Sequence, residues 1–280
     1  MEGVDYENFN AVVSKLRDFF KDIKGYKEVH TQNKLSILAA CEDPQTIATY
    51  NYNGEVWPLP QTGQMWLEHY LLEHPEEKGF FCVSTSYRNE PNPVEGRHDK
   101  IFPMFEFELK GGIDELRKVE MELLDYLGFN KEGETMTYPR DDYDNVSKKY
   151  DVDELDHIHE EYMERDFGKA FFLEYFPLKT SPFWNMRLME DKVHAHKIDV
   201  IIHGIETIGS AERSVDKEQM RNMFNTISEG GYANTLFAQF GKERVQKELD
   251  DFLQKNFFER SGGGIGMTRM IRAMKLSNLI

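Results

Sequence analysis

The sequence predicts an α+β domain in which helices surround an antiparallel sheet. Strand-like segments occur in consecutive pairs that can form hairpins, helical segments are grouped around them, and the chain has no internal repeat or low-complexity tract. This order fits an antiparallel sheet better than alternating βαβ units. With 280 residues, of which 40% are hydrophobic, the chain can bury a full core, and we expect a single domain over residues 1–280.

Helices are predicted where apolar residues recur every three or four positions. In the first of them the apolar stripe runs from Phe9 to Ile23, and Gly25 ends the pattern. The long polar connection over residues 131–145 is expected to be exposed. The predicted helices are Tyr6–Lys24, Gln61–Glu73, Ile113–Leu127, Val152–Phe167, Asp216–Ser228 and Lys242–Phe257.

Strands are predicted where apolar and polar residues alternate. Residues 80–87 and 101–109 are joined by a polar loop with proline and glycine, which favours a long hairpin. In the second strand of this hairpin one face is apolar (Phe105, Phe107, Leu109) and the other is acidic (Glu106, Glu108). Three further strands are expected at residues 170–176, 183–190 and 197–205.

Charge and composition limit the function classes. The chain has 50 acidic and 34 basic residues, a net charge of -16, so its field repels nucleic acid. A tRNA partner is therefore disfavoured, although a local basic patch would still accommodate one. No long apolar run or signal pattern occurs, so no membrane contact and a cytoplasmic location are expected. Cys41 and Cys82 lack the spacing of a zinc site and are expected to pack in the core.

The segment from Ser261 to Arg269, SGGGIGMTR, is interpreted as a glycine-rich turn that leads into a helix. Glycines let the backbone approach a ligand, a helix start offers unpaired N–H groups, and Arg269 adds a planar guanidinium. These are the parts of a polyphosphate site. Taken alone, such a segment is more often only a tight connection.

A second group of candidate residues lies on the predicted hairpin. An arginine can hold a phosphate through two hydrogen bonds, a glutamate can accept from an exocyclic amine, and a phenylalanine can stack on a base. Together they would bind ATP; the alternative for each is a solvated charge or a core ring. The candidates are Arg88, Glu90, Arg97, His98, Phe102 and Glu106.

A third group consists of Asp199, Glu206 and Arg213. The two acids bracket a strand-like stretch, and two carboxylates near a phosphate site are suitable ligands for Mg²⁺. Arg213 would hold a substrate carboxylate. The alternative is two acids at strand ends and an arginine on the surface.

These three groups resemble motifs of the class II aminoacyl-tRNA synthetases, in the aspartate and asparagine branch. Residues 87–106, with Tyr-Arg-Asn-Glu at the start, resemble motif 2; residues 199–213, DVIIHGIETIGSAER, resemble the branch's substrate and metal strand; and residues 262–269, GGGIGMTR, resemble motif 3. The matches run from about Val29 to the C-terminus. The resemblance implies the class II catalytic fold, with a central antiparallel sheet flanked by helices.

For the nucleotide, the resemblance implies that Arg88 holds the α-phosphate, Glu90 the adenine amine, and Phe102 and Arg269 the two faces of adenine. Arg88 and Arg269 are the expected catalytic residues. His98 would reach toward the β- and γ-phosphates, and Arg97 is a further expected nucleotide contact. ATP and Mg²⁺ are the expected cofactors, with the metal ion held by Asp199 and Glu206.

For the amino acid, the resemblance places Gln64 near the α-carboxylate and Glu42 at the α-ammonium. Glu106 is a further expected substrate contact, and Arg213 would take the end of the side chain. Since the branch's aspartate enzymes have a lysine near Leu67, Arg213 is the one obvious cation for a substrate carboxylate in the sequence.

Departures from the family pattern narrow the function. The strand at residues 28–31 lies close to the N-terminus, so no anticodon-binding domain is expected. Gln32 replaces the proline of motif 1, the motif that forms the dimer in this family, so the contact of the expected homodimer departs from the family pattern. Ile101 and Thr268 stand where acids are usual. A neutral residue before Arg269 resembles the ammonia-dependent asparagine synthetases, while residues 62–68 resemble asparaginyl-tRNA synthetase.

We therefore expect activation of aspartate by ATP, followed by amidation with ammonia to asparagine. The small-molecule partners are then the amino acid, ATP and ammonia. Two alternatives remain: a free-standing relative of the synthetases that loads tRNA or another acceptor, and a catalytically silent subunit.

Overall fold

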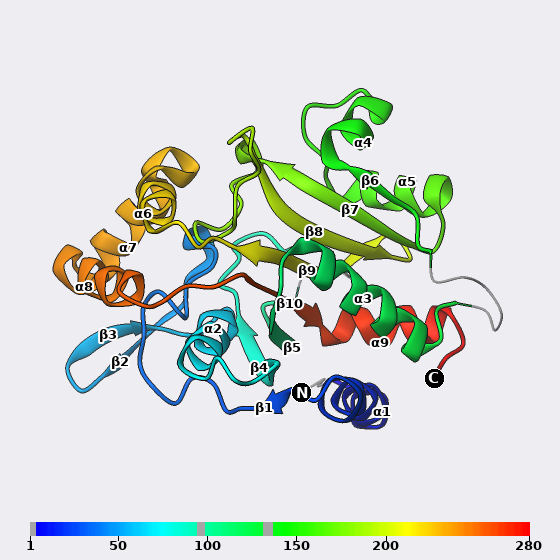
Figure 1. Ribbon diagram of the computed structural model, residues 1–280, viewed down its shortest axis with the longest axis horizontal. Coiled ribbons are helices and arrows are strands. Elements are labelled where there is room, and N and C mark those ends of the chain that lie inside the picture. The colour runs from blue at the N-terminus through cyan, green and yellow to red at the C-terminus, as the bar shows by residue number, and fades with distance from the viewer. Residues whose placement is uncertain (1–3, 94–98, 131–136) are drawn as a thin grey trace.

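The computed structural model describes residues 4–93, 99–130 and 137–280, and within these residues eight strands form one sheet in the order β1-β4-β5-β10-β9-β8-β7-β6 (Figure 1). Along this order all neighbours from β4 to β7 pair antiparallel, whereas β1 with β4 and β6 with β7 are parallel. The predicted α+β class with a central antiparallel sheet is confirmed. The strands are β1 (Lys27–Glu28), β4 (Gly79–Tyr87), β5 (Ile101–Lys110), β6 (Arg140–Asp142), β7 (Ala170–Pro177), β8 (His194–Ile202), β9 (Ile205–Arg213) and β10 (Arg260–Gly266).

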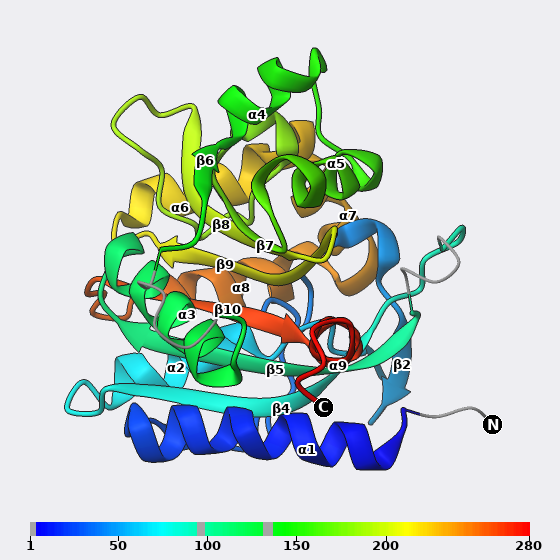
Figure 2. The ribbon, with the colours of Figure 1, turned by 90° about the vertical axis from the view of Figure 1, so that its right-hand side faces the viewer.

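One face of the sheet carries the largest apolar core. Helices α1 (Tyr6–Arg17), α3 (Ile113–Leu127) and α9 (Met267–Leu276) cover it, as Figure 2 shows from the side of α3 and α9. The side chains that meet there include Phe105, Phe107 and Ile265 from the strands. These are the apolar halves of alternating strands, so the acidic halves of the same strands lie on the opposite face.

The opposite face supports a second core and leaves room for a cavity. Its apolar cluster surrounds Trp184, which is fully buried between the rings of Phe224 and Phe252. None of the helices in the described part of the chain is long and apolar enough to cross a membrane. The elements here are α2 (Gln64–Glu73), α4 (Tyr143–Tyr150), α5 (His157–Phe167), α6 (Lys217–Thr226), α7 (Gly231–Phe240), α8 (Lys242–Leu253) and the hairpin of β2 (Thr49–Tyr52) with β3 (Glu55–Pro58).

Two predicted strands differ from the structure. Residues 183–190 make two isolated bridges, Met186 to Arg213 and Leu188 to Ala195, because Trp184 is buried in the helical core instead of along a strand ladder. The strand predicted at 197–205 ends at Ile202. His203 and Gly204, with φ of 47° and 69°, form a two-residue turn into β9, which is the geometry that tight hairpins require.

Other boundaries were also wrong. The helix expected from Val152 begins at His157, since the Asp156 side chain caps it by accepting from the N–H groups of Ile158 and His159. The connection expected over residues 131–145 contains β6 and the start of α4; residues 131–136 lie outside the described part. The β2–β3 hairpin was not predicted, although Asn53-Gly54 between its strands, with φ of 53° and 81°, is the usual signal of a tight hairpin turn; α7 was not predicted either.

The glycine-rich segment is a strand and not a turn. β10 pairs with β5 on one side and β9 on the other, so it lies in the middle of the sheet. A Cβ at Gly262 would lie 2.1 Å from Oε2 of Glu108 and 2.3 Å from the Phe107 carbonyl oxygen. The glycines are therefore required by neighbouring strands that come very close, and the helix with Arg269 starts only after this strand.

Replacing Gly262 by alanine is expected to destabilise the fold by about 1–3 kcal/mol, because the new methyl group has no space beside the Phe107 backbone. Gly231→Ala is the matched control: its φ is -61° and its nearest neighbour would be the Ser228 side chain at 3.7 Å. Urea denaturation midpoints measure both variants. Equal midpoints for the two would contradict the close packing of β10.

Candidate functional site

A cavity of about 310 Å³ opens on the acidic face of the sheet. Strand register aligns Asp199, Gly209, Gly264 and Glu106 in one row across β8, β9, β10 and β5. Because the two central residues of this row have no side chain, the row forms a trough with a carboxylate at each side. The next row has the same design, with small residues between two charged ones: Lys197, Ala211, Gly262 and Glu108.

The structure brings most of the candidate residues together around this cavity. Asp199 lies directly beside it, and Arg97 and His98 lie outside the described residues. Segments far apart in the sequence contribute, from the loops before α2 to the start of α9. The candidates that line the cavity are Glu42, Gln64, Arg88, Glu90, Phe102, Glu106, Glu206, Arg213 and Arg269.

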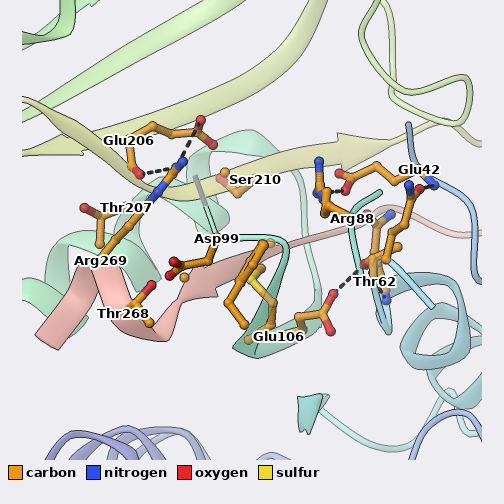
Figure 3. A pocket seen from close by; sticks show the side chains of 18 of the residues that line it. Glu42, Thr62, Arg88, Asp99, Glu106, Glu206, Thr207, Ser210, Thr268 and Arg269 are labelled. Carbon is orange, nitrogen blue, oxygen red and sulfur yellow. Dashed lines mark hydrogen bonds and ion pairs between the residues drawn. The ribbon is translucent and has the colours of Figure 1, made fainter. Parts of the chain in front are cut away.

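Two arginines mark opposite ends of the cavity (Figure 3). Arg88 follows β4, and its Nη2 donates to Oε2 of Glu42 at 2.6 Å. Arg269 lies in the first turn of α9; its Nη1 donates to the Glu206 carbonyl oxygen at 2.7 Å and lies 3.8 Å from Oε2 of the same residue. Both guanidiniums are only about one-third exposed, which strengthens their attraction for an anion.

Glu106 is a fixed acceptor at the opposite wall from Asp199. Its carboxylate accepts from the Gly63 N–H at 2.8 Å, from the Ser84 hydroxyl at 2.5 Å and from the Thr62 hydroxyl. Burial raises the pKa of Glu106, and these donors partly offset that effect. The side chain is thus held rigidly at the edge of the cavity, where a ligand ammonium would find an acceptor.

Arg213 belongs to a buried group of four charges that we call the ionic quartet: Glu68, Glu108, Arg213 and Arg260. Arg213 donates to both oxygens of Glu108 at 3.2 Å, and Arg260 donates to Oε2 of Glu68 at 3.0 and 2.7 Å. All four side chains are at most 1% exposed. The two guanidiniums outweigh burial and lower the pKa of Glu68. Arg213, expected to be available for a substrate, lines the cavity but is balanced by the buried acid Glu108.

Sequence reasoning missed Glu68, Arg260 and Glu108 as parts of the site. The signal was the acidic face of β5, where Glu106 and Glu108 alternate with phenylalanines. Glu106 was predicted from the sequence as a substrate contact and lines the cavity, whereas Glu108 is buried beside it against Arg213.

The two carboxylates expected to hold a metal ion are neighbours. Both lie above Gly209: a Cβ there would be 2.8 Å from Oε1 of Glu206 and 3.6 Å from Oδ1 of Asp199. Among the described residues, Asp199 Oδ1 is a buried oxygen without a hydrogen-bond partner. Burial and the charge of Glu206 raise the pKa of Asp199 to about 7, an effect that a cation would reverse.

This donor set fits a hard cation such as Mg²⁺, which prefers carboxylate oxygens and completes its shell with water and phosphate. The described residues contain no group of three or more acidic, histidine or cysteine side chains that could hold a metal ion. A site with two protein ligands fits a metal ion that binds together with a nucleotide, because the phosphate oxygens then supply further ligands.

Lys197 is a cation of the cavity that the sequence did not reveal. Its Nζ donates to Oδ2 of Asp199 at 2.6 Å and lies 3.7 Å from the centre of the Phe176 ring. It lines the cavity one row away from Arg213. The signal was its spacing of two from Asp199, which places both side chains on one face of β8.

The glycine-floored cavity, with an arginine after a hairpin strand and another at the start of the C-terminal helix, defines a class II synthetase-like domain. The chain belongs to the family of tRNA synthetases class II (D, K and N), which matches residues 7–280. The resemblance seen in the sequence motifs is thereby confirmed. No curated protein matches the chain in a sequence comparison.

Solved structures share the fold at low sequence identity. Asparaginyl-tRNA synthetase from Pyrococcus horikoshii, complexed with asparaginyl-adenylate, has a TM-score of 0.77 and 19% identity, over 95% of this chain and 64% of that one. The Entamoeba histolytica asparaginyl-tRNA synthetase, also in complex with asparaginyl-adenylate, has a TM-score of 0.70 and 16% identity, over 96% of this chain and 63% of that one. A putative aspartyl-tRNA synthetase from Leishmania major Friedlin has a TM-score of 0.73 and 16% identity, over 98% of this chain and 63% of that one. The chain spans less than two thirds of the length of these proteins.

Proposed function

We propose that the protein activates an amino acid with ATP, forming an acyl-adenylate and releasing pyrophosphate. The observation that supports this best is the arrangement of Arg88 and Arg269 at opposite ends of one cavity, with the paired carboxylates of Asp199 and Glu206 on its floor. Arg88 at one end can neutralise the α-phosphate, and Arg269 at the other end can stack on the base and neutralise the outer phosphates. A carboxylate and a triphosphate are both anions, so such a site must supply several positive charges.

In the proposed reaction the residues hold the two substrates in position and neutralise their charges, and none of them forms a covalent bond with a substrate. Arg88 holds the α-phosphate, Phe102 and Arg269 enclose adenine, and Glu90 accepts from its amine. Glu106 and Glu42 take the substrate ammonium, with Gln64 beside the α-carboxylate. A Mg²⁺ ion at Asp199 and Glu206 would supply further neutralisation of the phosphates. The substrate carboxylate then attacks the α-phosphate in line, and pyrophosphate leaves.

The finer proposal is that the substrate is aspartate, that its β-carboxylate faces the α-phosphate and is activated while its α-carboxylate lies toward Arg213, and that ammonia is the acceptor. Ammonia attacks the acyl carbon with its lone pair, the bond to AMP breaks, and a proton is lost to give asparagine. The net charge of -16 supports a small acceptor over tRNA. The likeness to tRNA synthetases favours the alternative, in which the aminoacyl group of the adenylate is transferred to tRNA and AMP leaves.

One experiment separates these functions. Purified protein with ATP, Mg²⁺ and a panel of amino acids is assayed for ATP–pyrophosphate exchange, and then for AMP and product with and without ammonium chloride. We expect exchange with aspartate in the absence of tRNA, and AMP together with asparagine only when ammonia is present. Turnover that requires tRNA would support the alternative. No exchange with any amino acid would reject both. The expected homodimer is checked by light scattering of the same sample.

Arg213 is expected to act on the amino acid more than on ATP. Arg213→Lys keeps one positive charge for Glu108 but loses the planar, two-pronged donor, so the KM for the amino acid should rise about 10- to 100-fold. The KM for ATP should stay within about twofold. Arg187→Lys is the control, because Arg187 pairs with Glu212 outside this cavity. Equal increases in both constants would place Arg213 on the nucleotide side.

A further inference from the structure

Lys197 stands where the proposed phosphate and metal sites meet. Its side chain lines the cavity, is 22% exposed, and donates to Asp199 Oδ2 at 2.6 Å. The other oxygen of Asp199 has no partner among the described residues. One carboxylate thus has one oxygen committed to an ammonium and one available on the side of Glu206.

The lysine is held in place from two sides. A β-bulge in β7, with Tyr175 at a φ of 58°, shifts the register between Glu174 and Phe176. Bulges redirect side chains, and here the Phe176 ring lies 3.7 Å from the Lys197 Nζ. A cation held by a ring and a carboxylate stays at a fixed point of the cavity, which distinguishes it from a mobile surface lysine.

The Lys197 ammonium faces carboxylates of the cavity. Its Nζ donates to Asp199, and the side chains of Glu206 and Glu42 line the same cavity. A divalent ion placed between Asp199 and Glu206 would therefore compete with the Lys197 ammonium for the Asp199 carboxylate and would be repelled by its positive charge.

We propose that Lys197 is a built-in cation of this site, which shares Asp199 with the divalent metal ion and makes metal binding depend on nucleotide. Without nucleotide, the ammonium offsets the charge of Asp199 and keeps the metal ion weakly bound. When ATP is present, its phosphate charges compensate for the repulsion, so metal ion and nucleotide bind together. This inference rests on the proposed function for the phosphate site, but it concerns binding alone and needs no turnover.

The test is Mn²⁺ binding followed by electron paramagnetic resonance, with and without a non-hydrolysable ATP analogue. In nucleotide-free protein, Lys197→Met should bind Mn²⁺ at least about tenfold more tightly than the wild type, and Lys197→Arg should behave as the wild type. The analogue should tighten Mn²⁺ binding strongly in the wild type and much less in Lys197→Met, because the coupling passes through the lysine charge. Lys197→Gln, which keeps a donor for Asp199, replaces Lys197→Met if that variant does not fold.

Two controls make the result specific. Lys247→Met removes an exposed lysine paired with Asp251 on α8, and it should leave Mn²⁺ binding unchanged. The double variant Lys197→Met with Asp199→Asn should lose the gain in affinity. Equal Mn²⁺ affinity in the wild type and Lys197→Met, or a gain that persists in the double variant, would overturn the proposal. A gain without any pyrophosphate exchange would leave this inference standing and reject the proposed function.

Discussion

Replacing Arg88 by alanine is expected to lower the rate of ATP–pyrophosphate exchange by about 10²–10³-fold while the fold remains intact. The guanidinium is partly buried and faces the cavity, and among the described residues it is the cation that we assign to the α-phosphate. In other enzymes, removal of a fixed donor that faces charge developing in the transition state lowers the rate by about this factor. Arg269→Ala should have an effect of the same order, since it removes the cation at the other end.

The matched control for Arg88 is Arg17→Ala. Arg17 also pairs with a glutamate, Glu28, at 2.8 Å and is similarly exposed, but it lies on α1, away from the cavity. Its exchange rate should equal that of the wild type. Arg88→Lys should fall between wild type and alanine, because a lysine keeps the charge and loses the two-pronged geometry. An Arg88→Ala protein with an exchange rate within about twofold of the wild type would remove Arg88 from the site.

Arg260→Met is expected to reduce the free energy of unfolding by about 3–5 kcal/mol, the largest stability effect that we expect in this chain. Arg260 and Glu68 are both fully buried, and the substitution leaves the Glu68 charge in the interior with one distant guanidinium, that of Arg213 at 4.0 Å. The loss arises from this uncompensated charge and exceeds the value of the intact pair. Urea denaturation followed by circular dichroism measures it.

A second substitution tests this cause. Glu68→Gln added to Arg260→Met removes the stranded charge, and the double variant should recover more than half of the lost stability. Arg221→Met, which breaks an exposed pair with Asp250 at 2.7 Å, should change stability by at most about 1 kcal/mol. If the double variant is as unstable as Arg260→Met alone, loss of packing and not charge explains the effect.

The acidic face of β5 shows which features a local sequence pattern predicts and which it does not. The alternation in residues 101–109 predicted a strand and assigned its two faces, and both predictions are confirmed. The pattern could not tell that Glu106 and Glu108 are buried, because this depends on α2 and the ionic quartet, whose members come from four separate segments. For Glu106 the sequence left a solvated charge open as the alternative to a ligand contact, and in the fold both acids are buried.

The residues of the proposed nucleotide site could be selected from the sequence because a motif is local: Arg88 and Glu90 are two positions apart, and Arg269 comes three positions after Gly266. The α+β class and most helices followed from periodicity for the same reason. The fold was needed to show that the glycines form a central strand, that Arg213 is balanced by Glu108, and that Lys197 is bonded to Asp199 inside the cavity. These features depend on which strands become neighbours and in which register, and that is set by packing over the whole sheet, which a local pattern does not contain.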